Sequence, residues 1–438
     1  MTTPTPQAAP PLSVPVSGAA AAGGSRAATP EIAPSLLFLL VAFIGMQPFS
    51  TDMYLATLPA LTDAFSTTPA AVQMTLTAFM LGFAGAQLIA GPLSDRFGRR
   101  PTALWGLVLY TSASLVGALA PTLAVLVFAR LIQAFGVCCT VVCSRAIVRD
   151  RYEVPAGAQV MARTMTWMSL VPIVGPISGA ILLAALGWRS NFVVMVIGGA
   201  LVLAATWRWL PETNMARDRH ATDLGPLLKN YLHIGRNGQF WAFTLMATLS
   251  YGALFSFISG SSFVIIRVLG IPSQYFGFTF AFIVCGYLVG TWITRWMLPI
   301  IGLYGTLYRG AALSCASGAV MAAFALAGIH TLATLLLPMV GVMVAHALLQ
   351  SCAQVGAVGP FPRNTGAAVA LFGFVLSVAA ALVGTWIGAS HDGTVVPLTL
   401  TIGAITLGVA LVAATLVRRA ERRDDEVAAA RSKAAGGR

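Results

Sequence analysis

Long uncharged apolar stretches alternate along the chain with short segments that carry charge, proline or glycine. A helix needs about 20 mainly apolar residues to cross the hydrocarbon core of a bilayer. Because lipid offers the backbone no hydrogen-bond partners, each such stretch should be an α-helix. The pattern predicts twelve spans, at roughly 35–60, 70–93, 101–120, 122–147, 158–185, 191–210, 239–264, 274–297, 306–328, 331–357, 366–389 and 394–417.

The composition points to the same class of protein. Hydrophobic residues make up 57% of the 438 residues, and charged residues make up only 9%. A soluble domain carries about 25% charged residues. This much apolar surface cannot be hidden in one aqueous core, so the chain is predicted to be an all-α membrane protein whose surplus apolar surface faces lipid.

A polar segment at 211–238 divides the spans into two sets of six. We expect an N-terminal six-helix bundle at 35–210, a cytoplasmic linker with one surface helix at 211–238, and a C-terminal six-helix bundle at 239–417. Residues 1–34 are rich in Pro, Ala, Ser and Thr and should form a disordered cytoplasmic tail. Residues 418–438 are polar and basic and should form a frayed cytoplasmic tail.

The basic residues predict the orientation in the membrane. Of the 26 Lys and Arg residues, only Arg189 and Arg267 fall in loops that would face outward with a cytoplasmic N-terminus, and Arg130 lies within a span. An excess of basic residues marks the cytoplasmic side, so both termini should be cytoplasmic. The net charge of +12 is then a topology signal, because the basic residues are spread over short loops and do not form one nucleic-acid-binding surface.

One carboxylate, Asp52, lies in the otherwise uncharged first span. A charge at the bilayer centre costs about 2.5–3.5 kcal/mol on insertion scales. Arg130 of span four and Asp52 each lie nine residues from the predicted outer end of their span, about 13 Å deep at 1.5 Å per residue. We expect the two charges to be partners or to line one aqueous cavity. They would either couple transport to protons or form a structural ion pair.

The loop "GPLSDRFGRRP" (residues 91–101) joins spans two and three. Gly91 should let the end of span two approach a neighbouring helix closely, and Asp95 should lie at the positive N-terminus of a facing helix. The arginines should pair with carboxylates such as Asp150 and Glu153. A loop that only fixes topology would not need this order of residues. The candidate latch residues are Gly91, Asp95, Arg96, Gly98, Arg99, Arg100 and Asp150.

Span five carries two prolines and two glycines in a short stretch: Pro172, Gly175, Pro176 and Gly179. The prolines should kink the helix, and the glycines should allow close packing. The stretch would be a bent, closely packed helix, and such a seam could also seal a cavity against proton leak.

Span ten carries His346, Gln350 and Gln354 at a spacing of four, which places them on one helix face. They would line a substrate cavity or make hydrogen bonds between helices, and His346 is expected to be structural more often than proton-carrying. Gln133 lies one turn from Arg130 on the same face. Aromatic candidates for the cavity, which would otherwise pack or meet lipid, are Tyr54, Trp167, Tyr251, Phe255 and Phe257.

The sequence contains no P-loop, no G-x-S-x-G, no H-E-x-x-H and no carboxylate pair suited to hydrolysis. We therefore expect neither an enzyme nor an ATP-driven pump, and the remaining energy source is an ion gradient. The six cysteines form no CxxC pair. They should be packing residues, without a disulfide or a metal site.

Several of these motifs resemble those of the major facilitator superfamily. The loop at 91–101 is similar to its signature loop, "RLIQAFG" (130–136) to its span-four motif, and "PIVGPISGA" (172–180) to the span-five motif associated with antiporters. Five further stretches look like the bicyclomycin and chloramphenicol resistance branch of drug:proton antiporters: "STDMYLATLPAL" (50–61), "SRAIVRDRY" (144–152), "SFISGSSFVI" (256–265), "FGFTFAF" (276–282) and "PFPRNTGAAVAL" (360–371). The second-half counterpart of the charged loop, at 294–310, is degenerate and keeps mainly Arg295 and Arg309.

The resemblance implies two six-helix bundles with a cavity between them near mid-bilayer. It implies export of small amphipathic antibiotics in exchange for protons, with Asp52 as proton carrier and the charged loop as a latch on the inner side. Alternatives are a proton-coupled nutrient importer on the same fold, a non-transporting membrane sensor, and a membrane enzyme. We expect a monomer in the bacterial cytoplasmic membrane that contacts lipid, drug and protons, needs no cofactor and binds no nucleic acid.

Overall fold

The computed structural model describes residues 32–436, so the predicted disordered tail lies almost wholly outside the described part of the chain. The described residues form helices joined by short connections, in two groups separated by a linker. The N-terminal half contains α1 (Pro34–Asp52), η1 (Leu55–Thr57), α2 (Leu58–Ala64), α3 (Pro69–Phe97), α4 (Arg99–Ala118), α5 (Leu123–Arg151), α6 (Val154–Met168), α7 (Val171–Leu186) and α8 (Arg189–Trp209). The linker contains α9 (Leu224–Gly235). The C-terminal half contains α10 (Gly238–Ser262), η2 (Phe263–Val268), α11 (Ser273–Leu326), α12 (Leu332–Val358), α13 (Thr365–Ala389), α14 (Val396–Val412), η3 (Ala413–Val417) and α15 (Arg418–Gly436).

Local sequence explains where several of these helices begin. The side chains of Thr68 and Thr122 accept hydrogen bonds from the first turns of α3 and α5. Thr331 and Thr334 form a reciprocal capping box at the start of α12. Such caps satisfy backbone N–H groups that have no partner within the helix. They fix the helix starts at the ends of the bundle, where the apolar runs begin.

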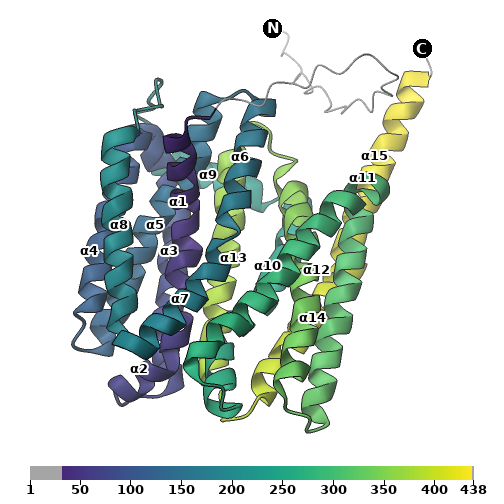
Figure 1. Ribbon diagram of the computed structural model, residues 1–438. Helices are drawn as coiled ribbons and strands as arrows, with labels where there is room; N and C mark the ends of the chain where they lie inside the picture. Colours follow the sequence, from purple (N-terminus) through teal and green to yellow (C-terminus); the bar gives the residue numbers. More distant parts are fainter. Residues whose placement is uncertain (1–31, 437–438) are drawn as a thin grey trace, which may run out of the picture.

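The structure contains the twelve predicted spans. Ten helical segments are long and apolar enough to cross a membrane, and one of them, α11, has 54 residues. Its backbone leaves the helical conformation at Gly302 (φ 69°, ψ −176°), where the chain folds back and divides α11 into two spans. The twelfth span is α4, whose 20 residues extend about 30 Å and which packs along α5 and α8. The fold is therefore an all-α membrane fold of two six-helix bundles (Figure 1).

Span one is present as predicted, as one membrane-crossing segment at Pro34–Ala64, but it is irregular after Asp52, where the chain passes through a short turn into η1 and α2. One expectation about the helix ends was wrong. The C-terminal segment is not frayed, because α15 continues from η3 as a helix (yellow in Figure 1). The hydroxyls of Tyr304 and Tyr308 donate to the carboxylates of Asp424 (2.5 Å) and Glu421 (2.6 Å), which ties α15 to α11.

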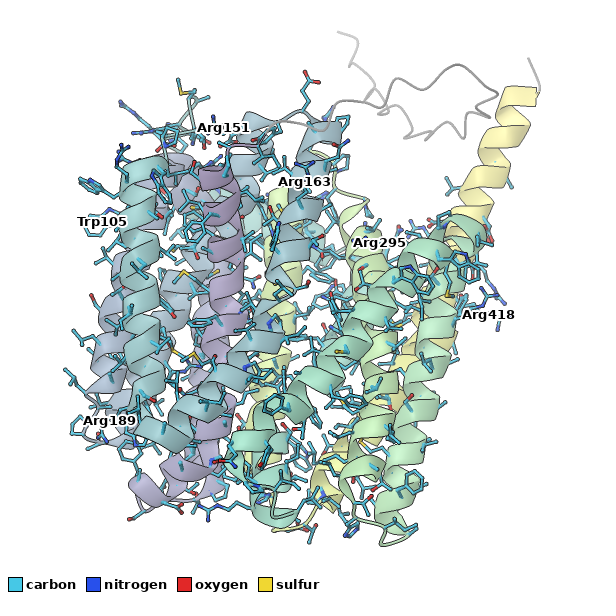
Figure 2. All side chains as sticks on the ribbon, in the orientation of Figure 1. Trp105, Arg151, Arg163, Arg189, Arg295 and Arg418 are labelled. Carbon is cyan, nitrogen blue, oxygen red and sulfur yellow. The ribbon has the colours of Figure 1, made fainter. Side chains whose placement is uncertain are left out.

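Arginines mark one end of the bundle. Figure 2 shows Arg151, Arg163 and Arg295 toward one end and Arg189 near the other. We call these the basic end and the opposite end. The two halves contact each other along α3 and α13, from Gln73 beside Gly388 to Gln87 beside Gly373, and near the opposite end, where α7 packs against α11. Toward the basic end, α6 packs on α1 and α5 of its own half.

Candidate functional site: a broken helix beside a cavity between the halves

Asp52 is the last residue of α1 and is almost completely buried. The Thr51 hydroxyl donates a hydrogen bond to its Oδ1 (2.9 Å). Pro48 lies inside α1, one turn before the helix ends. Where a helix ends inside lipid, its last carbonyl groups lack partners within the helix and must find them on neighbouring helices.

Arg130 and Asn191 provide these partners. Nη1 of Arg130 on α5 donates to the carbonyl of Ser50 (3.1 Å), and the amide of Asn191 on α8 donates to the carbonyl of Met53 (3.2 Å). A cation near a helix C-terminus also interacts favourably with the helix dipole. The break in span one is thus held by two residues from other helices of the same half.

The expected partnership between Arg130 and Asp52 is wrong. Arg130 is completely buried, its guanidinium carbon lies 4.6 Å from the centre of the Tyr54 ring and 4.3 Å from that of Phe79, and its Nη1 also donates to Gln133 (2.6 Å). Within residues 32–436 neither Arg130 nor Asp52 takes part in an ion pair. Equal depth did not bring the two charges together, because the guanidinium is directed at the backbone of α1 and is enclosed by two rings.

The glycines of span five allow close packing, as the sequence predicted, and the segment they pack against is the break in span one. A Cβ atom on Gly179 would clash with the backbone of Met53, 2.8 Å from its carbonyl carbon. A Cβ atom on Gly175 would be 3.7 Å from the Cβ of Asp52. Span five itself is divided between α6 and α7, just before Pro172. The α1–α7 seam, formed by Met53, Asp52, Gly175 and Gly179, therefore leaves no space for larger side chains at Gly179.

A cavity of about 160 Å³ lies between the two halves. It is lined from the N-terminal half by α1, α3 and α5 and from the C-terminal half by α10, α12 and α13. Arg145 lies six residues before the end of α5 and Gln354 four residues before the end of α12, so the cavity lies in the part of the bundle nearer the basic end. Its polar lining residues are Gln47, Gln87, Arg145, Tyr251, Gln350, Gln354 and Ser377.

Three of the predicted cavity residues line this cavity: Tyr251, Gln350 and Gln354. The others lie elsewhere. His346 makes a hydrogen bond with Ser250 (2.9 Å) and lies between aromatic rings of α10 and α11. Five further residues are placed as follows: Tyr54 is buried and hydrogen-bonded to Thr75, Gln133 joins Arg130 to Ser114, Phe255 and Phe257 are buried in the C-terminal half, and Trp167 is exposed on α6.

The halves are held together near the opposite end by several polar contacts. The side chains of Gln73 on α3 and Ser259 on α10 are hydrogen-bonded, and the hydroxyls of Thr77 and Thr385 lie 3.2 Å apart. Arg267 of η2 forms an ion pair with Asp63 of α2. These contacts close the opposite end over the cavity.

The charged loop forms a network at the basic end. Nε of Arg99 donates to Asp150 (2.7 Å) and Nη1 donates to Asp95 (2.6 Å), so the predicted Arg99–Asp150 pairing is confirmed. Arg96 reaches Thr222 of the linker, and Arg100 donates to the Trp207 carbonyl (2.9 Å). Within the described residues, these side-chain bonds all go to the N-terminal half or the linker.

Two expectations about this loop were wrong. A Cβ atom on Gly91 would meet nothing within 4 Å, so Gly91 is not a close-contact position. The glycine that the loop requires is Gly98, whose φ is +106° and where an added Cβ atom would meet the Glu212 side chain. Asp95 pairs with Arg99 one turn along the same segment, and the negative charge at the start of α4 comes instead from Glu212.

Sequence reasoning missed three residues. The carboxylate of Glu212 accepts hydrogen bonds from the backbone N–H groups of Arg99 (2.9 Å) and Arg100 (3.3 Å), and so caps α4. Asn191 holds the break in span one. Arg145 projects into the cavity, although in the sequence it looks like one more basic residue near a helix end. The signal that could have found Arg145 is its distance from that end, about 9 Å at 1.5 Å per residue.

A cavity between two packed six-helix halves defines a membrane transporter. The model of the Major Facilitator Superfamily matches residues 37–385, and the chain belongs to this family. It is 27% identical to the "Bicyclomycin resistance protein homolog" of Haemophilus influenzae, over 84% of this chain and 93% of the relative. It is 29% identical to the "Chloramphenicol resistance protein" of Pseudomonas aeruginosa, over 89% and 92%. Among solved structures, a POT family transporter in complex with a thioalcohol-conjugated peptide shares the fold, with TM-score 0.71, 13% identity and coverage of 88% and 96%.

Proposed function

We propose that the protein exports small amphipathic antibiotics of the phenicol or bicyclomycin type in exchange for protons. Support comes from the names of the relatives, which are drug resistance proteins aligned over most of their length. It comes also from the cavity, which is lined by both halves and can therefore change its access when the halves move. The energy source would be the proton gradient, with no further cofactor.

The observation that carries the antiport proposal is the position of Asp52. It is a buried carboxylate at a helix break, hydrogen-bonded by Thr51 and without an ion-pair partner in the described part of the chain. Such a carboxylate can take up and release a proton when its exposure to water changes. Gln47, which lines the cavity, lies just over one turn before Asp52 on α1.

The proposed orientation places the basic end in the cytoplasm of a bacterial inner membrane, with both termini inside. The contacts that join the halves near the opposite end then make this conformation inward-facing. Its cavity is smaller than the roughly 300–1,000 Å³ typical of drug sites. Drug entry therefore requires the halves or their side chains to move further apart.

Transport into inside-out vesicles tests both drive and direction. An acidic lumen should power uptake of radiolabelled chloramphenicol, and added drug should release protons from the lumen. A gradient of one pH unit supplies about 1.36 kcal/mol per proton, enough for about tenfold accumulation of a neutral drug. The membrane potential adds about 2.3 kcal/mol per 100 mV for each charge moved, so exchange of one proton for one neutral drug should respond to voltage as well as to pH.

The result has clear alternatives. Uptake that survives an uncoupler and stops when ATP is removed would overturn antiport. Uptake into right-side-out vesicles along an inward proton gradient would make the protein an importer. A protein reconstituted in folded form that moves none of the relatives' drugs in either direction would overturn the export proposal.

A further inference from the structure

The cavity between the halves contains one charged side chain among the described lining residues, and it is an arginine. Arg145 is exposed to this space and comes from α5 of the N-terminal half. Within residues 32–436 its guanidinium makes no hydrogen bond and no ion pair with another side chain. No Asp or Glu lines the cavity among the described residues. The positive charge of Arg145 is therefore not neutralised where a substrate would bind.

The other polar groups of the cavity are uncharged and come from both halves. Gln47 and Gln87 belong to the N-terminal half, and Tyr251, Gln350 and Gln354 belong to the C-terminal half. Oε1 of Gln350 is shielded from solvent and has no hydrogen-bond partner in the described structure. A buried acceptor without a partner is unfavourable, so a ligand that brings a hydroxyl or amide N–H donor would gain affinity by donating to it.

These two features specify a ligand. Like charges repel at short range in a partly desolvated site, so a cation beside Arg145 is disfavoured, and no carboxylate among the described lining residues offsets the repulsion. We propose that Arg145 makes the cavity selective for neutral or anionic amphipathic molecules that carry a carbonyl, nitro or carboxylate acceptor together with a hydroxyl or amide donor. Lipophilic cations are rejected. The inference rests on the proposed function only in taking this cavity as the substrate site.

The selectivity has a consequence for coupling. A cationic drug can replace a proton at a carboxylate directly, because both carry positive charge. A neutral or anionic drug cannot neutralise Asp52 in this way. Asp52 is not among the described residues that line the cavity, so exchange of such a drug for a proton requires a change in the helix packing around Asp52, which α7 approaches at Gly175.

Direct binding and transport of three probes test the selectivity. The probes are chloramphenicol (neutral), its hemisuccinate ester (anionic) and tetraphenylphosphonium (cationic). Binding to the purified full-length protein is measured by equilibrium dialysis, and uptake is measured in proteoliposomes. The variants are Arg145→Gln, Arg145→Lys and Arg145→Glu. Arg149→Gln is the matched control, because Arg149 lies one turn further along α5 and does not line the cavity.

The wild-type protein should bind the hemisuccinate at least as tightly as chloramphenicol and should bind the cation weakly. Arg145→Gln should lose at least about tenfold in affinity for the hemisuccinate, the lower range for a lost charged hydrogen bond, with a smaller loss for chloramphenicol. Arg145→Lys should keep most of the affinity for the hemisuccinate, and Arg145→Glu should bind tetraphenylphosphonium more tightly than the wild type does. Arg149→Gln should match the wild type for all three probes.

Two results would overturn the inference: unchanged hemisuccinate affinity in Arg145→Gln, or tight cation binding by the wild type. If Arg145→Gln does not fold, Arg145→Lys is compared with Arg149→Gln instead. Loss of the preference for the anionic probe in Arg145→Lys would then count against the inference. Failure of the proposed function can be told apart from failure of this inference. Absence of proton-coupled transport would leave the differences in probe affinity between the wild type and the Arg145 variants unchanged. Normal proton-coupled export of chloramphenicol, together with unchanged probe affinities in the Arg145 variants, would overturn the selectivity and leave the proposed function standing.

Discussion

Gly98 and Gly302 turn the chain at corresponding places in the two halves, and both have positive φ, 106° and 69°. Around Gly98 the turn is surrounded by charge: Arg99 binds two carboxylates, and Glu212 caps the next helix. Around Gly302 an added Cβ atom would meet nothing within 4 Å, and the neighbouring tyrosines only fasten α15. The corresponding turns therefore differ: a charged network surrounds the turn at Gly98, whereas the turn at Gly302 has open space beside it.

The difference extends into the membrane. The N-terminal half contains Asp52, Arg130 and Arg145 within or near its spans, whereas the cavity residues of the C-terminal half are uncharged. A charged side chain within the membrane is energetically costly, so its presence there indicates a functional role. Under the proposed antiport, the N-terminal half contributes the charged side chains of Asp52 and Arg145, and both halves contribute uncharged hydrogen-bonding groups to the cavity.

The largest expected effect comes from removing the carboxylate of the N-terminal half. Asp52→Asn keeps the size of the side chain and the hydrogen bond from Thr51 but cannot carry a proton. Proton-driven chloramphenicol accumulation in proteoliposomes should fall to background, while the variant remains folded and in the membrane. Asp392→Asn, in an exposed loop of the C-terminal half, is the control and should accumulate drug normally. Normal coupled export by the Asp52→Asn variant would remove Asp52 from the mechanism.

The next effect tests whether Arg130 acts through charge and hydrogen bonding. Arg130→Ala leaves the Ser50 carbonyl and the Gln133 side chain without their donor, at about 1–3 kcal/mol for each buried group. It should lower the melting temperature in detergent and abolish transport. Arg130→Lys retains a cation that can still donate hydrogen bonds, although without the planar geometry of the guanidinium, so partial activity should remain.

Two outcomes would contradict this account of Arg130. Equal activity of the lysine and alanine variants would show that the charge is unimportant. A lysine variant as unstable as the alanine variant would show that the planar guanidinium between the Tyr54 and Phe79 rings is needed for folding.

Much of the fold was predictable because lipid permits few solutions. Long apolar runs had to be helices, and the polar linker divided them into two halves. Depth along a helix was also predictable from its rise per residue. Side-chain direction was not, because it depends on how each helix is rotated against its neighbours. For that reason Asp52 and Arg130 were expected to pair, although Arg130 instead binds the backbone of α1.

The cavity was predictable only in part. Gln350 and Gln354 stood out as amides on one face of an apolar helix, and both line the cavity. Arg145 did not stand out, because an arginine near a helix end is also what the orientation rule requires. The break after Asp52 left no clear signal either, since the flanking prolines, Pro48 and Pro59, lie several residues away. Partners far apart in sequence, such as Asn191 and Met53, hold the break.

A smaller effect is expected at the charged network. Asp95 lies at the basic end, outside the cavity lining, and pairs with Arg99 while its side chain remains nearly half exposed. Asp95→Asn should slow transport several-fold with little change in drug affinity, because it alters the balance between conformations rather than the binding site. Equilibrium dialysis and proteoliposome turnover measure the two quantities. Arg295→Gln, near the turn of the C-terminal half, should change neither, and a large affinity loss in Asp95→Asn with normal turnover would refute the latch.

The smallest effect compares the two turns directly. Gly302→Ala meets only backbone strain, which costs about 1–3 kcal/mol for a residue in a sparsely populated conformation. Gly98→Ala meets similar strain and in addition displaces the Glu212 carboxylate, whose Cδ would lie 2.8 Å from the new Cβ atom. Gly98→Ala should therefore lower the melting temperature more than Gly302→Ala, and only Gly98→Ala should slow transport, since only that turn carries the network. Gly91→Ala is the control, because Gly91 has open space around it and an ordinary helical backbone. Equal losses of stability in the two variants, with equal transport turnover, would contradict this comparison. They would mean that the Glu212 side chain can move aside without loss of stability and that the charged network does not affect transport.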